Sequence, residues 1–211
     1  MRIRNAWSCG YNVFMEKPPA QQALPPQTLL LTDGGAASLL ALLLLLSDPV
    51  DEAGVILLHV RGGRHGAGSR RRLEAVRRRA DLLQTAGVRV LDGPGGPLRE
   101  GLHEAVRSEA SRLVWPTRQL AGLTAAAEAE AGLLSRLSIQ RPPPHVSCPL
   151  VGMSGPEVVR GVVAAWPAEE RTPWSSLVRW CDLGEVEPCG SCGGCQRWAA
   201  WASGQAVPGL G

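Results

Sequence analysis

Apolar positions along the chain alternate between short continuous runs and longer stretches with helical spacing. The runs predict buried strands, and the stretches between them predict helices. The predicted strands are 28–32, 54–60, 88–91, 112–115 and 137–140, and the predicted helices are 36–47, 68–86, 98–109, 120–134 and 156–165. Strands that alternate with helices join by right-handed crossovers. The pattern therefore predicts an α/β protein with a doubly wound, mostly parallel five-stranded sheet of the Rossmann-like type.

The two ends of the chain have a different pattern from this central region. Residues 1–27 hold four prolines and no apolar period, which predicts an N-terminal tail. The α/β domain then spans 28–166, and a cysteine-rich C-terminal segment spans 167–211. The second predicted helix, Gly68 onward, is followed by Gly87, which we expect to cap it.

One leucine-rich stretch has to be distinguished from a membrane span. Asp33, Gly34 and Gly35 interrupt it, and the unbroken part, 36–46, is shorter than the ~20 residues that a spanning helix needs. The start of the chain is polar and basic, without the apolar run of a signal peptide. We therefore expect no membrane partner and a cytoplasmic location.

Charge changes this picture little. The 211 residues carry a net charge of +3, too weak to argue for nucleic-acid binding, and Lys17 is the single lysine. Arginines gather at 70–72 and 77–79, inside a predicted helix. Such a run usually covers a solvated face, although contact with phosphate or RNA is the alternative.

Four of the six cysteines form a constellation near the C-terminus: Cys181, then Cys189-Gly-Ser-Cys192-Gly-Gly-Cys195. Four thiolates fill a tetrahedral site and leave no position for a catalytic water, so this spacing predicts structural zinc. An iron–sulfur cluster uses the same ligands, and redox thiols are a further alternative. The glycines are expected to supply unusual backbone angles.

Tryptophans surround these cysteines in the sequence. We expect Trp174, Trp180, Trp198 and Trp201 to shield the metal from water as a small apolar shell.

A glycine turn follows the first predicted strand. Residues 32–38 place Asp33, Gly34, Gly35 and Ser38 between a strand and a helix. Backbone N–H groups in such a turn bind phosphates at the carboxyl ends of parallel strands. A tight connection without a ligand is the other interpretation.

Several of these segments together resemble the 7-cyano-7-deazaguanine synthase family of PP-loop ligases, over residues 28–200. The turn at 32–38 looks like the Ser-Gly-Gly-x-Asp-Ser pyrophosphate loop, and the cysteine segment looks like the family's zinc-binding end. Shorter similarities lie at Arg64-His65, at Pro116 to Gln119, at Pro149-Leu150 and at Glu157 to Val159.

The resemblance implies an enzyme of queuosine biosynthesis. Such enzymes use ATP with Mg²⁺ to activate the carboxylate of 7-carboxy-7-deazaguanine, convert it with ammonia to the amide, and dehydrate that to the nitrile. It further implies a purine-like substrate and a homodimer. Nucleotide-binding residues would be Asp33, Gly34, Gly35, Ser38, Arg64, His65 and Arg118.

Two departures from the family pattern raise an alternative. Asp33 stands where the loop has its first serine, and Ala37 stands where it has its aspartate. The substrate loop is reduced to 141–147. A catalytically degenerate relative that acts as a binding or partner protein is therefore the competing hypothesis, and an RNA-facing zinc protein is a third. An open, anion-sized pocket at 32–38 would favour the enzyme, and a pocket filled by Asp33 would favour the degenerate relative.

Overall fold

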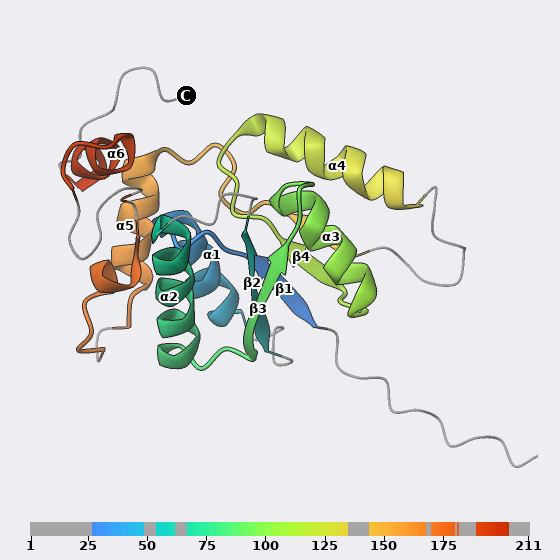
Figure 1. The fold of residues 1–211 in the computed structure, drawn as a ribbon, viewed down its shortest axis with the longest axis horizontal. Helices are drawn as coiled ribbons and strands as arrows, with labels where there is room; N and C mark the ends of the chain where they lie inside the picture. Colours follow the sequence, from blue (N-terminus) through green and yellow to red (C-terminus); the bar gives the residue numbers. More distant parts are fainter. Residues whose placement is uncertain are drawn as a thin grey trace, which may run out of the picture.

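A computed structural model describes residues 27–48, 54–61, 67–134, 144–167, 170–179, 181 and 189–202. Within these ranges five parallel strands form one sheet in the order β3-β2-β1-β4-β5 (Figure 1). The strands are β1 (Thr28–Leu31), β2 (Val55–Arg61), β3 (Gly87–Asp92), β4 (Arg112–Val114) and β5 (His145–Ser147). The helices are α1 (Ala36–Leu46), α2 (Ala67–Leu82), α3 (Pro97–Arg107), α4 (Leu120–Leu134), α5 (Gly155–Ala165), the 3₁₀ helix η2 (Trp174–Leu177) and α6 (Gly193–Ala202).

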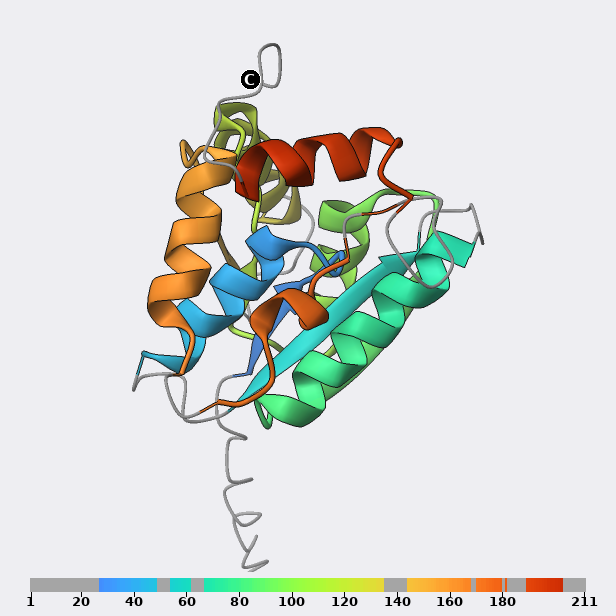
Figure 2. The same cartoon turned by 90° about the vertical axis from the view of Figure 1, so that its left-hand side faces the viewer.

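Helices cover both faces of the sheet, as the sequence pattern predicts. Successive strand residues point to opposite faces, so Leu30 packs with α1, α2 and α5, whereas Leu29 and Leu31 pack with α3 and α4. Figure 2 shows α1, α2 and α5 together on the side that faces the viewer. The doubly wound α/β fold is thereby confirmed, and its central strand β1 is buried throughout.

The strand order reverses beside β1, and this reversal decides where a ligand can bind. Chain order runs outward through β2 and β3 on one side of β1 and through β4 and β5 on the other. The crossovers on the two sides lie on opposite faces, which separates the loops that follow β1 and β4. In open α/β sheets, ligands bind in the crevice at this point, outside the carboxyl ends of the strands.

One sequence prediction needs correction, and another lies outside the described residues. Gly87 does not cap α2; it begins β3, and α2 ends at Leu82, followed by Gln84 with a positive φ of 50°. The predicted fifth strand, 137–140, lies outside the described residues, as do residues 1–26. The fifth strand of the sheet is His145–Ser147, directly after the proline run. Prolines favour an extended backbone, so a strand can follow them directly.

No helix in the described part of the chain has the length and apolar character that crossing a membrane requires.

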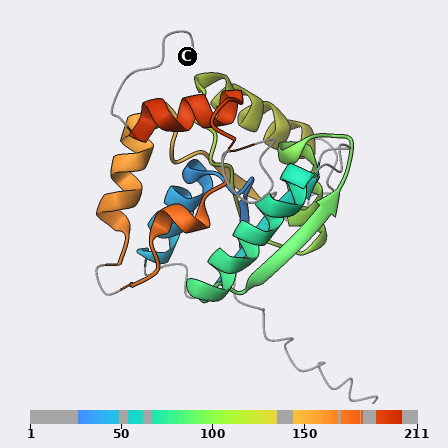
Figure 3. The same ribbon diagram turned by 60° about the vertical axis from the view of Figure 1, so that its left-hand side comes forward.

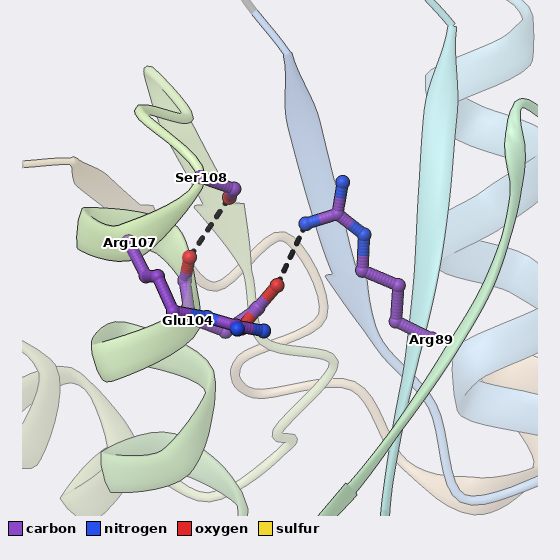
Figure 4. A network of polar contacts seen from close by, with 4 residues as sticks. All are labelled: Arg89, Glu104, Arg107 and Ser108. Carbon is purple, nitrogen blue, oxygen red and sulfur yellow. Dashed lines mark hydrogen bonds and ion pairs between the residues drawn. The ribbon is translucent and has the colours of Figure 1, made fainter.

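A buried carboxylate lies between α3 and the outer part of the sheet. Glu104 of α3 is 3% exposed and accepts hydrogen bonds from Arg89 Nη1 of β3 at 2.6 Å and from Arg107 Nε at 2.8 Å (Figure 4). Its backbone carbonyl accepts a bond from the Ser108 hydroxyl at 2.8 Å. A buried carboxylate is tolerated only when it is paired in this way. The network therefore holds α3 against the edge strand.

Replacing Glu104 by Gln tests this network. The variant keeps the shape of the side chain but removes the charge that both guanidiniums face, so we expect the free energy of unfolding to fall by about 2 kcal/mol. Urea denaturation measures the change. Glu74→Gln, which affects an exposed pair with Arg78 on α2, should cost about 0.5 kcal/mol or less. Equal losses in the two variants would show that burial of Glu104 contributes nothing.

Candidate functional site

A cavity of about 330 Å³ lies at the point where the strand order reverses. It is bounded by the loop after β1, the loop after β4, the start of α2, the segment after η2 and the first turns of α6. The lining residues are Asp33, Gly35, Ala36, Ala37, Arg72, Pro116, Thr117, Arg118, Gln119, Val178, Arg179, Gly194, Arg197 and Trp198. The structure thus brings Asp33, Gly35 and Arg118 of the predicted nucleotide site into one pocket.

The glycine loop after β1 is shaped by a close approach of α2. Gly34 has a φ of 82°, a left-handed conformation that side chains rarely adopt. A Cβ at Gly34 would also lie 3.1 Å from the backbone carbonyl oxygen of Arg72. Both constraints require glycine. The predicted residues Arg64 and His65 lie outside the described residues, so their relation to this loop stays a prediction.

Asp33 turns back onto the start of α1. Its Oδ1 accepts a hydrogen bond from the Gly35 N–H at 2.8 Å and lies 3.1 Å from the Ser38 hydroxyl. A carboxylate at a helix N-terminus is favoured by the helix dipole. Asp33 therefore uses one of the amides that a phosphate would seek, while Gly35, Ala36 and Ala37 still line the open pocket.

A buried arginine supports the loop from below. Arg79 of α2 is 1% exposed. Its guanidinium donates to the carbonyl oxygens of Gly34, of Gly35 at 3.0 Å and of Leu177 at 2.7 Å, and to the Ser38 hydroxyl at 2.9 Å. Burial lowers the pKa of Arg79 to about 10, and the nearby Asp33 carboxylate opposes that shift. The group therefore remains charged at neutral pH.

The arginine run on α2 does not form the single solvated face that its sequence suggests. Arg70, Arg77 and Arg78 are exposed, but Arg72 lines the pocket and Arg79 is buried beneath the glycine loop. The prediction was wrong for these last two because a helix packed on a sheet turns some positions of any charge run inward.

Four arginines line the pocket, from four separate parts of the chain. They are Arg72, Arg118, Arg179 and Arg197, and Asp33 is the one carboxylate among the described lining residues. Burial lowers the pKa of Arg118, and the neighbouring charge of Arg197 lowers it further. Arginines that repel one another in a half-enclosed cavity create a site that an anion stabilises. The sequence offered phosphate contact for Arg72 only as an alternative and did not place Arg179 and Arg197 in this site, because only the fold brings the three together.

A second, smaller cavity of about 180 Å³ adjoins the first and shares Asp33, Ala37 and Pro116 with it. Its other walls are mainly apolar and come from the ends of β1 and β2, the start of α3 and Trp115. The two cavities together offer a charged chamber beside an apolar one.

The four predicted metal ligands converge. The Sγ atoms of Cys181, Cys189, Cys192 and Cys195 all lie within 4.8 Å of one another, with 3.9 Å between Cys181 and Cys192 and 4.0 Å between Cys189 and Cys195. A tetrahedral ion with metal–sulfur bonds of about 2.3 Å separates its sulfurs by about 3.8 Å. The cluster therefore fits one metal ion, whereas a 4Fe-4S cluster binds each cysteine through a different iron and spreads the thiolates further apart.

Backbone N–H groups point at these sulfurs. The N–H of Cys192 donates to Cys189 Sγ, and the N–H of Cys195 donates to Cys192 Sγ, each at 3.4 Å. The first of these bonds is the main reason that the pKa of the Cys189 thiol is lowered. Gly190 has a φ of 74°, as the tight turn requires. Gly193 and Gly194 instead form the first turn of α6.

Two of the four tryptophans can be located by their side chains. The rings of Trp174 and Trp198 meet edge to face, 5.6 Å apart at an interplanar angle of 63°. Both pack against the main core on the α1, α2 and α5 face of the sheet, and Trp198 also lines the pocket. The side chains of Trp180 and Trp201 lie outside the described residues. Trp174 and Trp198 thus join the metal-bearing segment to the core and the pocket.

The fold and the pocket together define a doubly wound α/β protein with a cationic site at its switch point. No protein-family model matches the sequence, and no curated protein matches it. Solved structures with a similar arrangement include a U34-tRNA thiolase, NcsA, from Methanococcus maripaludis with its 4Fe-4S cluster (12% identity, TM-score 0.48), covering 72% of this chain and 63% of that chain.

An NAD⁺ synthetase from Burkholderia pseudomallei is similar at 14% identity and a TM-score of 0.39, covering 86% of this chain and 75% of the synthetase. A universal stress protein in complex with cAMP is similar at 19% identity and a TM-score of 0.38, covering 58% and 94%. The chain therefore spans less than two thirds of the thiolase. At these scores and identities the likeness concerns the arrangement of strands and helices and assigns no function.

Arg79→Ala should destabilise the protein strongly. The substitution leaves the buried Leu177 carbonyl without its arginine donor and removes one of the two donors to the Gly34 carbonyl. We expect a loss of about 3 kcal/mol in the free energy of unfolding. Arg79→Lys should recover only part of it, because an ammonium cannot reach four acceptors in a fork. The adjacent exposed Arg78→Ala is the matched control, with a change of about 0.5 kcal/mol or less. Similar urea midpoints for both alanine variants would contradict the supporting role of Arg79.

The cysteine cluster predicts one metal ion per chain. Elemental analysis of the purified protein should give one equivalent of zinc, and Cys192→Ser should lower it well below one because a ligand is missing. Cys148→Ser, at the thiol that lies outside the cluster, should leave the metal content unchanged. Several equivalents of iron together with acid-labile sulfide would instead identify an iron–sulfur centre.

Proposed function

We propose that this chain binds nucleotide phosphates in the switch-point pocket and is an ATP-dependent ligase of the PP-loop type. The observation that carries the proposal is the convergence of Arg72, Arg118, Arg179 and Arg197 on the first turn of α1. Phosphates are bound by guanidiniums and by the N–H groups of helix N-termini, and this cavity is lined both by arginines and by the first turn of α1.

The charge balance supports anion binding despite Asp33. At a separation of about 4 Å and an effective dielectric constant near 20, one carboxylate raises the energy of a phosphate charge by about 4 kcal/mol. Each guanidinium at a similar distance lowers it by as much. Four such groups outweigh the one carboxylate, and Asp33 is also partly neutralised by the charge of Arg79. The same carboxylate is the one acidic group among the described lining residues that could help to hold Mg²⁺.

The smaller cavity supports a nucleotide rather than a bare phosphate. A planar base fits an apolar slot walled by Trp115, Leu58 and Val60, while the phosphates extend past Asp33 into the charged chamber. The shared lining residues allow one ligand to occupy both.

The specific reaction that we propose is the one implied by the resemblance. The chain would use ATP to activate the carboxylate of 7-carboxy-7-deazaguanine for attack by ammonia, and a second activation would lead to the nitrile. In this proposal the arginines hold and neutralise the phosphates, and Arg118, half-buried between the loops after β4 and β5, orients them. A zinc ion at the four cysteines would be structural.

A second candidate function rests on the Asp33–Gly35 hydrogen bond. Asp33 already accepts a hydrogen bond from the Gly35 N–H, so the loop can satisfy its own amide without a phosphate. This is expected for a catalytically degenerate relative that binds a ligand or partner without turnover. Ala37 adds to this, since no carboxylate stands where the family's loop has one.

Binding and turnover measurements separate these functions. The metal-loaded protein should bind ATP and pyrophosphate, with an affinity that falls as salt rises. Arg118→Ala should weaken binding by roughly tenfold or more, the value of one charge-assisted bond. Arg77→Ala, which removes an exposed arginine of α2 outside the pocket, should leave binding unchanged. Absence of binding at millimolar nucleotide would overturn the nucleotide proposal.

Turnover decides between enzyme and degenerate relative. An enzyme should incorporate ammonia into 7-carboxy-7-deazaguanine with consumption of ATP, as mass spectrometry of the product would show. Nucleotide binding without this reaction supports the second candidate. In that case Asp33→Ser with Ala37→Asp should tighten ATP binding, because it frees the Gly35 amide and restores the loop's carboxylate.

A further inference from the structure

The four-cysteine cluster and the anion pocket share the same two chain segments. Cys181 lies two residues after Arg179, and Cys195 lies two residues before Arg197, and both arginines line the pocket. Resting on the anion site proposed above, we propose that metal binding at the cysteines assembles this pocket, so that the metal and a polyanionic ligand bind cooperatively.

The first segment is held to the glycine loop independently of the metal. The backbone N–H of Arg179 donates to the Gly34 carbonyl at 2.9 Å, and Arg79 donates to the Leu177 carbonyl at 2.7 Å. The position of Arg179 is therefore fixed by the loop itself. A metal ion on Cys181 is thereby anchored to the floor of the pocket.

The second segment, α6, has much weaker support of its own. It spans ten residues, Gly193–Ala202, and begins with two glycines. Isolated helices of this length are marginal in water, and glycine lowers their stability further. Among its side-chain anchors are the Trp198 ring, which packs against Trp174 and the main core, and the buried Cys195. Figure 3 shows α6 crossing the end of α5, with which it is in contact.

The metal would fix the first turn of α6, and that turn carries part of the pocket wall. Gly194, Arg197 and Trp198 line the cavity, and Cys195 lies among them. A single ion bound to both Cys181 and Cys195 would connect the segment that is held to the glycine loop with the turn of α6 that carries Arg197. Without the ion, the described links among the four sulfurs are weak N–H···S and S···S contacts. Arg197 would then lose the tie that runs through Cys195, although Trp198 keeps its packing against Trp174 and the core.

Linkage makes this proposal measurable from both directions. If the metal raises the affinity for an anion by some factor, the anion raises the affinity for the metal by the same factor. With pyrophosphate as the probe, we expect the zinc-loaded chain to bind roughly tenfold more tightly than the chelator-stripped chain, the contribution of about one charge-assisted contact. Competition against a chromophoric chelator should show zinc affinity rising by a similar factor in saturating pyrophosphate.

Arg197→Ala provides the decisive variant, because it keeps all four cysteines. It should retain one zinc per chain while its zinc affinity no longer responds to pyrophosphate. Free pyrophosphate itself binds divalent metals, so the variant, the wild type and the Arg77→Ala control are compared in one buffer. A response in Arg197→Ala equal to that of the wild type would overturn the coupling, whether or not the stripped protein stays folded.

The outcomes also separate this inference from the function on which it rests. If the zinc-loaded wild type binds no pyrophosphate, the anion site and the coupling both fail. If the loaded and stripped proteins bind pyrophosphate equally, the anion site stands and the coupling alone is overturned.

Discussion

The buried guanidinium of Arg79 is the interaction on which the arrangement of the site depends. A charge inside a protein costs several kcal/mol unless hydrogen bonds satisfy it, and this one meets acceptors from the glycine loop, from α1 and from the end of η2. The side chain therefore joins three segments that are far apart in the sequence. Through them it fixes both the loop after the first strand and the approach of the chain to its cysteines.

The pocket above this arginine combines features that point in different functional directions. Its arginines and the open first turn of α1 form a strong anion site, whereas Asp33 supplies an internal anion to that same turn. The Asp33 carboxylate is covalently held beside the Gly35 N–H and competes weakly with a phosphate for it. Whether a phosphate displaces it depends on how much of the surrounding positive charge the ligand can reach at once.

The sequence predicted the order and type of the elements well because each depends on local pattern. The continuous apolar runs of β1 and β2 are typical of buried parallel strands. The spacing of the four cysteines was enough to predict that they converge. The strand His145–Ser147 was not predicted, because three residues between a proline run and a turn carry almost no periodic signal.

The pocket arginines were largely beyond reach from the sequence. Arg72 and Arg79 belong to one charge run, and only packing against the sheet reveals that one enters the cavity and the other lies beneath it. Arg179 and Arg197 lie beside the cysteines Cys181 and Cys195, and their segments were interpreted as metal-binding only. Long-range convergence of this kind follows from topology, and the position of the strand reversal would have been the best signal for it.

The two borders of the sheet bear on how this molecule can associate. β3 directs Arg89 inward to Glu104 and ends in the Arg61–Asp92 ion pair, and the opposite border, β5, is only three residues long. Inward charges and very short outer strands both discourage another polypeptide from extending a sheet. Within the described part of the chain, a continuous intermolecular sheet along these borders is therefore disfavoured, which favours contact between copies through the helical layers.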